Sequence, residues 1–317
     1  MQYPREHERE NTLRKYSKKS LVSSLQREGL VFSEFTLTHE GDYAVDDADW
    51  NYKDVPHLHY VHELAEAIPA VVGDDLIATI NMQKILMFRF PFALFNFESG
   101  WNTQTYYTTW LWHVLIIETA YESLGQCRTR VNTTYSIGCP PLLRWTFPIL
   151  KWVLRRNYDN LMSTDIPMRE RRGQLRSWGY SFFKEDERYS FEKTINITRP
   201  NVIAPDADVE LSDHVIDIAR TIPEDGQLLV GRDDVWGIRL VRKGGVLKIF
   251  PRLCPHEGAS LDATECRNNK IQCPWHGRTF EPLAEFDLDS FAAQEARIGS
   301  RLVKYHSGVI TIPLPSL

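Results

Sequence analysis

Hydrophobic and polar positions alternate over a long stretch in the first half of the chain. Between residues 76 and 137, the runs LIATINMQKILMFRF, TQTYYTTWLWHVLIIETAY and RTRVNTTYSIG are rich in β-branched and aromatic residues, and the segments ESGWN and ESLGQ separate them. Such runs, bounded by turn residues, are typical of strands joined by tight connections. We therefore expect an antiparallel meander over these residues.

Helical patterns flank this meander. Residues 55–68 predict a helix, with Asp54 as its N-cap and Pro56 in the first turn, where proline is tolerated. Residues 141–178 predict one long helix with a bend at Pro167. A curved sheet wrapped around this long helix would enclose an apolar cavity.

The pattern changes in the second half of the chain. Periodicity is weak from about residue 185 to residue 212, and short strands return from about residue 215, including IRLVRKGGVLKIF with a Gly244-Gly245 hairpin turn and the closing GVITIPL. The second domain is thus expected to be all-β. We expect a charged N-terminal extension at 1–45, a first domain at 46–185, a linker at 186–214 and a second domain at 215–317.

Composition narrows the functional classes. The 317 residues include 37 Lys+Arg and 42 Asp+Glu without a sustained basic block, which argues against a nucleic-acid partner. The longest apolar region, residues 140–154, is too short to span a bilayer and contains Arg144 and Lys151. Five cysteines, an odd count, favour free thiols in a reducing compartment, so we expect a cytoplasmic protein.

Two mixed Cys-His pairs stand out in the second domain. Cys254-x-His256 and Cys273-x-x-His276 are separated by sixteen residues. Four such ligands can hold zinc or an iron–sulfur cluster. Zinc fingers usually group two Cys and then two His, whereas mixed pairs allow two thiolates to hold one iron and two imidazoles to hold the other, which is the Rieske [2Fe–2S] arrangement.

The flanking residues extend this match. With CPHEGASL and CPWHGRTF around them, the pairs resemble the cluster-binding loops of Rieske proteins, and the resemblance covers about residues 215–317. Respiratory and photosynthetic Rieske proteins carry two further bridging cysteines, whose positions here hold Ala259 and Trp275. The resemblance is therefore to the oxygenase and ferredoxin branch.

A second group of metal-binding residue types lies in the first domain. The stretch DWNYKDVPHLHYVHE brings His57, His59 and His62 together with several acids. Two histidines and one carboxylate are the ligand set of many non-haem Fe(II) oxygenases. In a regular helix, His59 and His62 share a face, whereas residues five apart lie about 140° apart, so spacing alone favours His59 with His62. A local distortion near Pro56 would instead bring the rings of His57 and His62 together.

This stretch also resembles the Asp-x-x-His-x-x-x-x-His motif of Rieske-type ring-hydroxylating oxygenases, here Asp54, His57 and His62. The resemblance implies that His57 and His62 bind a mononuclear Fe(II) and that Asp54 is an electron-transfer bridge. It places the third ligand in NLMSTDIPMRE on the long helix. Asp165 is our choice there, and Asp159 and Glu170 are the alternatives.

Together, the resemblances imply an α+β chain: a helix-grip (START/SRPBCC-like) antiparallel sheet around a long helix, followed by an all-β Rieske domain. In the resembling family the Rieske domain usually comes first, so the order is swapped here. That family commonly forms head-to-tail homotrimers. Because the domain order is swapped here, the resemblance does not decide whether this chain also forms a homotrimer.

The implied function is a Rieske non-haem iron oxygenase. It would use O2, with electrons from NAD(P)H supplied through a reductase or ferredoxin, to hydroxylate, desaturate, demethylate or cyclise a small, apolar or aromatic substrate. The alternative is a Rieske ferredoxin-like electron carrier fused to a helix-grip domain that binds a lipid or another small molecule. Iron content separates the two, because the carrier needs no mononuclear iron.

Overall fold

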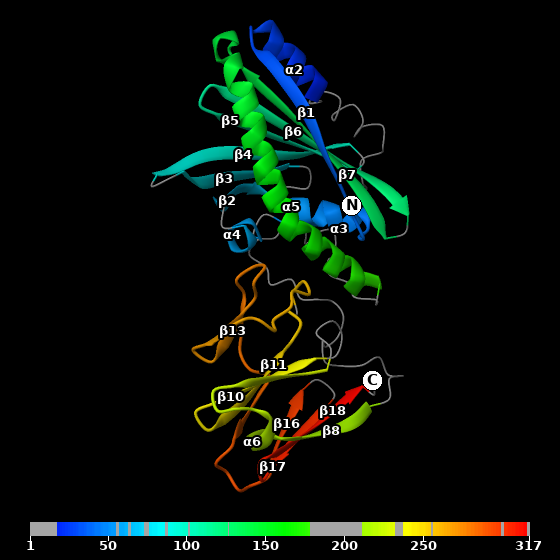
Figure 1. Cartoon of the computed structure of the whole chain (residues 1–317), viewed down its shortest axis with the longest axis vertical. Helices are drawn as coiled ribbons and strands as arrows, with labels where there is room; N and C mark the ends of the chain where they lie inside the picture. The colour runs from blue at the N-terminus through cyan, green and yellow to red at the C-terminus, as the bar shows by residue number, and fades with distance from the viewer. Residues whose placement is uncertain are drawn as a thin grey trace, which may run out of the picture. The chain divides into compact units, whose positions relative to one another are not determined.

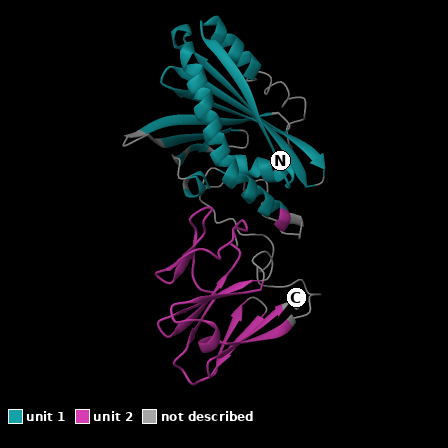
Figure 2. Cartoon of the chain, viewed as in Figure 1, with its two compact units in different colours: residues 1–173, 189–191 teal, residues 174–188, 192–317 magenta. Residues whose placement is uncertain are grey.

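The computed structural model describes residues 18–54, 57–62, 65–72, 76–85, 88–100, 102–125, 127–177, 211–231, 237–254, 256–298 and 301–315. The chain divides into two compact units (Figure 2). Unit 1 holds residues 1–173 and 189–191, and unit 2 holds residues 174–188 and 192–317. Most of the expected linker, residues 186–210, lies outside the described residues.

Unit 1 is built on one seven-stranded antiparallel sheet in the order β1-β7-β6-β5-β4-β3-β2 (Figure 1). The expected meander of residues 76–137 is present as five consecutive, neighbouring strands. The strands are β1 (Val31–Gly41), β2 (Ala65–Val72), β3 (Leu76–Ile85), β4 (Phe88–Gly100), β5 (Thr103–Trp110), β6 (His113–Gly125) and β7 (Arg128–Cys139).

The sheet begins at residue 31, earlier in the chain than the expected start of the first domain at residue 46. Residues 31–41, which we assigned to an N-terminal extension, form β1 and pair with β7 along its length, from Val31 opposite Cys139 to Gly41 opposite Thr129. The charged residues of this strand concealed it. Glu40, for example, accepts hydrogen bonds from both Arg128 and Arg130 across the sheet surface. A short helix, α2 (Lys18–Arg27), precedes the strand.

The expected helix at residues 55–68 differs from the structure. The chain forms α3 (Val45–Lys53) and the single-turn α4 (His57–Val61), and then becomes the edge strand β2. Asp54 is the C-cap of α3 rather than an N-cap, because its backbone N–H donates to the Trp50 carbonyl at 2.9 Å. The register of β2 shifts between Pro69 and Val71, as is tolerated at a sheet edge.

The expected long helix is confirmed. It consists of a 3-10 turn, η1 (Pro141–Thr146), and then α5 (Phe147–Ser177), with Pro167 inside the helix, and Figure 1 shows the helix changing direction in its second half. α5 packs on one face of the sheet, where Tyr158 and Met162 meet Tyr135 of β7. Among the described residues, no helix is long and apolar enough to cross a membrane.

Two arginines of α5 hydrogen-bond to side chains of α3. The Arg172 guanidinium donates to Asp47 at 2.5 Å, and the Arg169 guanidinium donates to the Asn51 side-chain carbonyl at 2.8 Å. All four side chains are buried. Because a buried charge needs a partner, these contacts fix the position of α3 and of the residues that follow it.

In its described residues, unit 2 consists of strands and loops apart from the short helix α6 (Ile218–Thr221) and the end of α5 from residue 174 onward. Its core contains Leu240, Ile249, Phe286 and Tyr305. β10 and β11 form the expected hairpin through Gly244-Gly245, where both glycines have positive φ. The strands form three sheets. The strands of this unit are β8 (Leu211–Asp217), β9 (Gln227–Val230), β10 (Ile238–Lys243), β11 (Val246–Pro251), β12 (Cys266–Arg267), β13 (Lys270–Gln272), β14 (Thr279–Phe280), β15 (Ala284–Asp287), β16 (Gln294–Ile298), β17 (Arg301–His306) and β18 (Val309–Pro315). The predicted α+β class, with a helix-grip arrangement first and an all-β domain second, is confirmed.

The buried pair between Asp47 and Arg172 yields a stability prediction. Asp47→Ala should lower the free energy of unfolding of unit 1 by about 3–5 kcal/mol, because it leaves a buried guanidinium without this carboxylate. Urea unfolding followed by far-UV circular dichroism measures the loss, since α5 lies almost entirely in this unit. The matched control is Glu122→Ala, which removes an exposed partner of Arg130 and should cost less than about 1 kcal/mol. Equal losses in the two variants would contradict the assigned role of the buried pair.

Candidate metal centres

The first candidate centre brings three expected ligands together in unit 1. His57 lies at the start of α4, His62 lies directly after α4, and Asp165 lies on α5. The Asp165 Oδ1 atom is 2.8 Å from His62 Nε2 and 3.6 Å from His57 Nε2. One ligand atom from each residue lies within 4.8 Å of the other two.

Because α4 is short, His57 and His62 can lie close together although they are five residues apart in the sequence. α4 ends at Val61, so His62 leaves the helix and its ring meets that of His57 at a centroid distance of 5.1 Å. The 140° separation that we noted applies only to an uninterrupted helix. His59 lies on α4, but its side chain is outside the described residues.

Neighbouring groups orient both imidazoles. The Nδ1 atom of His57 hydrogen-bonds the Asp54 backbone carbonyl and lies 3.5 Å from the Asp54 carboxylate. The Nδ1 atom of His62 hydrogen-bonds the Thr164 hydroxyl at 3.1 Å, and that hydroxyl donates to the Leu161 carbonyl, so it accepts from His62. With Nδ1 protonated on each ring, both Nε2 atoms carry lone pairs directed toward Asp165, which is the tautomer that a metal ligand needs.

The ligand atoms themselves fit a divalent metal. His57 Nε2, His62 Nε2 and Asp165 Oδ1 are all buried, and in the described residues none of them has a well-aligned hydrogen-bond partner. Three convergent, unsatisfied ligand atoms of this type match the two-histidine, one-carboxylate set that holds Fe(II) in oxygenases. Without a bound metal ion, buried polar atoms that lack a hydrogen-bond partner destabilise the fold.

The electrostatics of the three side chains are coupled. Burial raises the pKa of Asp165, but contacts with His57 and His62 outweigh it and hold this pKa below its ordinary value. Burial lowers the pKa of His57, but Asp165 and Asp54 outweigh it and raise the pKa to about 9. In the metal-free protein a proton therefore occupies His57 near neutral pH, and a metal ion has to displace it.

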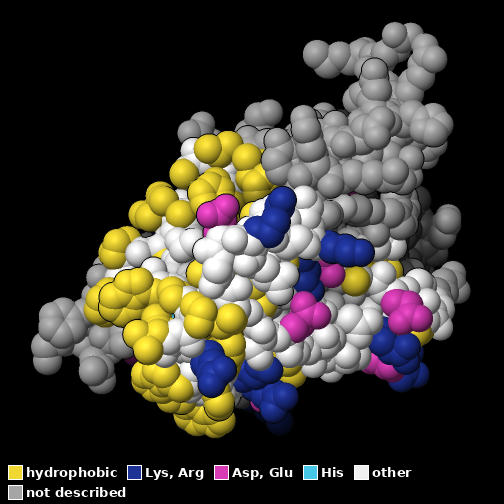
Figure 3. Space-filling view, turned by 90° about the horizontal axis from the view of Figure 1, so that it is seen from above, with side chains coloured by type: hydrophobic (Ala, Val, Ile, Leu, Met, Phe, Trp, Pro, Cys, Tyr) yellow, Lys and Arg dark blue, Asp and Glu magenta, His cyan; other side chains and the backbone are white. Residues whose placement is uncertain are grey.

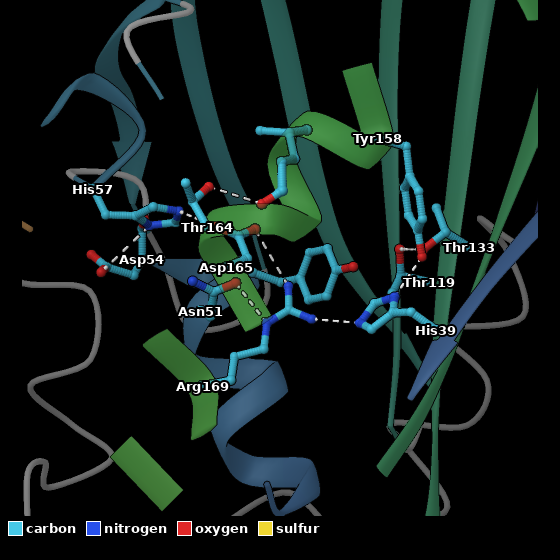
Figure 4. A network of polar contacts seen from close by, with 12 residues as sticks. His39, Asn51, Asp54, His57, Thr119, Thr133, Tyr158, Thr164, Asp165 and Arg169 are labelled. Carbon is cyan, nitrogen blue, oxygen red and sulfur yellow. Dashed lines mark hydrogen bonds and ion pairs between the residues drawn. The ribbon is translucent and has the colours of Figure 1, made fainter. Parts of the chain in front are cut away.

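A buried arginine holds the other oxygen of Asp165. Arg169 is fully buried, and its Nη2 atom donates to Asp165 Oδ2 at 3.5 Å (Figure 4). Its guanidinium also donates to His39 Nε2 at 2.9 Å and lies 4.4 Å from the Tyr52 ring centroid. Because Oδ2 faces Arg169, Oδ1 is the oxygen that faces both histidines.

The network continues from Arg169 into the sheet. Since His39 Nε2 accepts from Arg169, its Nδ1–H donates to the Tyr158 hydroxyl at 2.5 Å. Burial, followed by the charge of Arg169, lowers the pKa of His39 to about 3, so this ring is neutral. Arg169, His39 and Tyr158 were not among the residues that we predicted for this site. The only local indication was the i,i+4 spacing of Asp165 and Arg169 on a predicted helix.

The other acids that we considered as ligands lie elsewhere. Asp159 is exposed on α5, and Glu170 accepts a hydrogen bond from the Asp42 backbone N–H at 3.3 Å. Asp54 lies beside His57 through the two contacts given above. Of the three candidate carboxylates on α5, only Asp165 lies with the two histidines.

A cavity adjoins this centre within unit 1. It has a volume of about 190 Å³, and Asp54, His57 and Asp165 form part of its wall. The remaining wall comes mainly from the sheet and α5 and is largely aliphatic and aromatic. Its apolar and aromatic lining includes Ile77, Leu94, Ile117, Tyr135, Leu161 and Met162. The volume suits a small organic molecule.

The second candidate centre lies on two loops of unit 2. Cys254 and His256 lie on the loop after β11, and Cys273 and His276 lie on the loop between β13 and β14. The Nδ1 atoms of the two histidines are 3.2 Å apart, and their rings are nearly perpendicular. The thiols of the two cysteines are buried and within hydrogen-bonding reach of each other. The structure thus brings all four expected cluster ligands together.

The two loops share one backbone design. The carbonyl of each cysteine accepts from the N–H of the glycine four residues later, Gly258 at 3.0 Å and Gly277 at 2.9 Å. Both glycines have positive φ, which only glycine adopts without strain. The N–H of each cysteine donates to the carbonyl of the residue after that glycine. Each turn therefore holds its cysteine in a fixed position.

These four side chains fit a [2Fe–2S] cluster. Two sulfur atoms and two imidazole nitrogens converge from two loops, which is the ligand chemistry of the Rieske type. Hydrogen bonding from the Cys254 thiol lowers the pKa of Cys273 to about 5, and contacts with His276 and the backbone N–H groups of Trp275 and His276 add to this effect. The lowered pKa favours the thiolate form of Cys273, which is the form that binds metal.

Comparisons with known proteins agree with this arrangement. The Rieske [2Fe-2S] domain family matches residues 214–300. These residues are a Rieske domain, which implies a [2Fe–2S] cluster, and such domains occur in oxidoreductases and typically interact with redox partners. No curated protein matches the chain.

Solved structures are similar to the first part of the chain. The Zhui aromatase/cyclase from Streptomyces sp. R1128 is 13% identical, with a TM-score of 0.40, and the alignment covers 47% of this chain and 99% of that chain. Norcoclaurine synthase from Thalictrum flavum is 12% identical, with a TM-score of 0.37 and coverage of 50% and 93%. A START superfamily protein from Mycobacterium smegmatis is 10% identical, with a TM-score of 0.37 and coverage of 43% and 97%.

The loop geometry yields a prediction about the cluster. Cys273→Ala and His276→Ala should lose the visible absorption and the acid-labile sulfide, because each removes one of the four expected ligands. Cys266→Ala is the matched control, since this partly exposed cysteine lies in β12, outside both loops. Retention of the cluster in Cys273→Ala, or its loss in Cys266→Ala, would show that the ligands are assigned wrongly.

The neutral state of His39 yields a pH prediction. Between about pH 6.5 and pH 3, the unfolded state binds a proton at this residue and the folded state does not, so the free energy of unfolding falls as the pH falls through this window. His39→Gln should remove up to about 1.4 kcal/mol per pH unit from that slope, because an amide keeps both hydrogen bonds without titrating.

Urea unfolding of both proteins between pH 5 and pH 8 tests this prediction. Above pH 7 the two slopes should coincide, which provides an internal control. Parallel curves at all pH values would mean that His39 is not held neutral.

Proposed function

We propose that this chain is a Rieske-type non-haem iron oxygenase. It oxidises a small, apolar or aromatic organic substrate with O2, using electrons that a reductase draws from NAD(P)H and delivers directly or through a ferredoxin. The cluster ligands are Cys254, His256, Cys273 and His276, and the Fe(II) ligands are His57, His62 and Asp165.

One observation carries this proposal. Three buried ligand atoms of an Fe(II) type converge, two of them from residues in the wall of a cavity, in a chain that also contains a Rieske domain. A Rieske domain alone is compatible with a simple electron carrier. A second metal centre beside a cavity is what an oxygenase requires.

The residues around the first centre have separable tasks. Asp54 and Thr164 accept from the two Nδ1–H groups, which keeps both Nε2 atoms available as ligands. Arg169 holds Asp165 Oδ2, which leaves Oδ1 as the binding oxygen. Bound at the two centres, Fe(II) would supply O2 activation and the [2Fe–2S] cluster would supply single electrons.

The cavity supports the class of substrate. At about 190 Å³ it is smaller than the pockets of about 300–1,000 Å³ that bind drug-sized ligands. Aliphatic and aromatic side chains make up most of its wall, so burial of an apolar molecule is favourable and excludes water from the wall that carries His57 and Asp165. A small organic molecule with little charge fits these properties.

Asp54 is proposed as the electron-transfer bridge. Within unit 1 its backbone carbonyl and its carboxylate both lie against Nδ1 of His57, so it is the acid most directly linked to an iron ligand on the side away from the metal. Asp54→Asn should keep the iron and lower O2 consumption by the reduced protein about 10–100-fold, as for other outer partners of metal ligands.

Iron and acid-labile sulfide content of anaerobically purified protein, after Fe(II) has been offered, tests the proposed function. The wild-type chain should hold about three irons, and His57→Ala and Asp165→Ala should each hold about two, with the visible cluster spectrum unchanged. Asp159→Ala is the matched control, because it removes an exposed carboxylate from the same helix and should keep about three irons.

Two irons in every protein would favour the alternative, a Rieske electron carrier fused to a small-molecule-binding domain. The loss of one iron in Asp159→Ala, with retention in Asp165→Ala, would move the third ligand to Asp159.

A further inference from the structure

An exposed hydrophobic surface lies at one end of unit 1, and the proposed function does not use it. It consists of the turn between β5 and β6 and the helical residues that begin the long helix. We name it the tryptophan surface, and its members, each 55% to 86% exposed, are Leu111, Trp112, Leu142, Trp145, Ile149 and Trp152. Figure 3, which looks at this end from above, shows hydrophobic side chains gathered there with Lys and Arg beside them.

The helical members form a regular stripe. Leu142, Trp145, Ile149 and Trp152 follow one another at spacings of three or four residues, which places them on one face of η1 and α5. The opposite face of α5 packs on the sheet through Leu154, as expected for a core-facing helix. The start of this helix is therefore hydrophobic on two faces, and only one of them is covered by the described residues.

The turn between β5 and β6 adds to the same surface. His113, directly after Leu111 and Trp112, hydrogen-bonds through Nε2 to the Thr146 hydroxyl at the end of η1, at 2.9 Å. This bond joins the turn to the helical stripe. An exposed hydrophobic surface assembled from two separate segments is unusual in a soluble protein and is typical of an interaction site.

The charge around the helical stripe indicates which kind of partner the surface would bind. Residues 140–156 contain Arg144, Lys151, Arg155 and Arg156 and no acidic residue, although the whole chain has a net charge of −5. Of these, Arg156 lies over the Trp152 ring at 5.8 Å.

Two acids of the sheet, Glu34 and Glu118, lie near Lys18, which offsets their charge, and the exposed Asp159 follows Arg156 by three residues on α5. Glu34 pairs with the Lys18 ammonium at 2.8 Å, and Glu118 lies 4.0 Å from the same group. The helical stripe therefore presents tryptophan, leucine and positive charge to solvent.

We propose that the tryptophan surface docks the protein on an anionic lipid bilayer. Tryptophan prefers the boundary between headgroups and acyl chains, and nearby Lys and Arg are attracted to anionic lipids. Side chains this exposed protrude from the surface, so they can enter a bilayer without a matching pocket. Docking of this kind is peripheral and does not depend on the proposed function.

Co-sedimentation of the full-length, cluster-loaded protein with vesicles tests the proposal. One vesicle preparation is phosphatidylcholine alone, and the other contains about a third phosphatidylserine. The protein should sediment with the anionic vesicles, bind the neutral ones more weakly, and lose most of the difference at high salt because ions screen the attraction.

Two double variants separate the apolar and the electrostatic parts. Trp145→Ser with Trp152→Ser should lower the partition coefficient at least about tenfold on both vesicles, since it removes the apolar area of two of the three tryptophans of this surface. Arg155→Gln with Arg156→Gln should lower it about fivefold per charge, on anionic vesicles only. Phe291→Ser is the matched control, because Phe291 of unit 2 is 93% exposed but lies outside the tryptophan surface.

Three results would overturn the proposal. They are no sedimentation of the wild-type protein with either vesicle, equal partition of the tryptophan variant and the wild type, or equal loss in the Phe291 control. Light scattering of the lipid-free protein completes the test. A dimer that the tryptophan variant dissociates, without vesicle binding by the wild type, would identify the surface as an interface between two copies of this chain.

Discussion

The buried guanidinium of Arg169 is the interaction on which the arrangement of unit 1 depends. A charge with no exposure to solvent costs several kcal/mol unless its donors are satisfied. Here the partners come from three elements: His39 on β1, Asn51 on α3 and Asp165 on α5. These contacts bring β1, α3 and α5 together at one point, and the proposed metal ligands lie next to that point.

The two centres are built by different physical means. In unit 1, charged and polar side chains from distant parts of the chain hold the ligands, so the site depends on tertiary packing. In unit 2, two short turns closed by Gly258 and Gly277 hold the cysteines through backbone hydrogen bonds. A backbone turn requires only nearby residues, whereas a buried charge network requires the whole fold.

This difference explains what the sequence could predict. The Cys-His pairs were identified because their ligands and turns are local in the sequence. The strands from β3 to β7 and the long helix followed from periodicity. β2 did not, because its first residues were assigned to a helix, and β1 did not, because charged residues such as Glu34 and Glu40 line its exposed face. The end of α4 at Val61 was also missed, and it removes the geometric objection to pairing His57 with His62. Arg169 could not be found, since its partner His39 is 130 residues away.

The choice between an oxygenase and a carrier depends on the cost of burying ligand atoms. A domain that only encloses an apolar molecule gains nothing from a buried carboxylate that faces two imidazoles. A proton on His57, favoured by its raised pKa, would satisfy one contact with Asp165 Oδ1. The Nε2 atom of His62 would still face the same oxygen at 2.8 Å without an aligned hydrogen bond. A divalent cation satisfies all three atoms at once, so the geometry favours a metal centre over a simple ion pair.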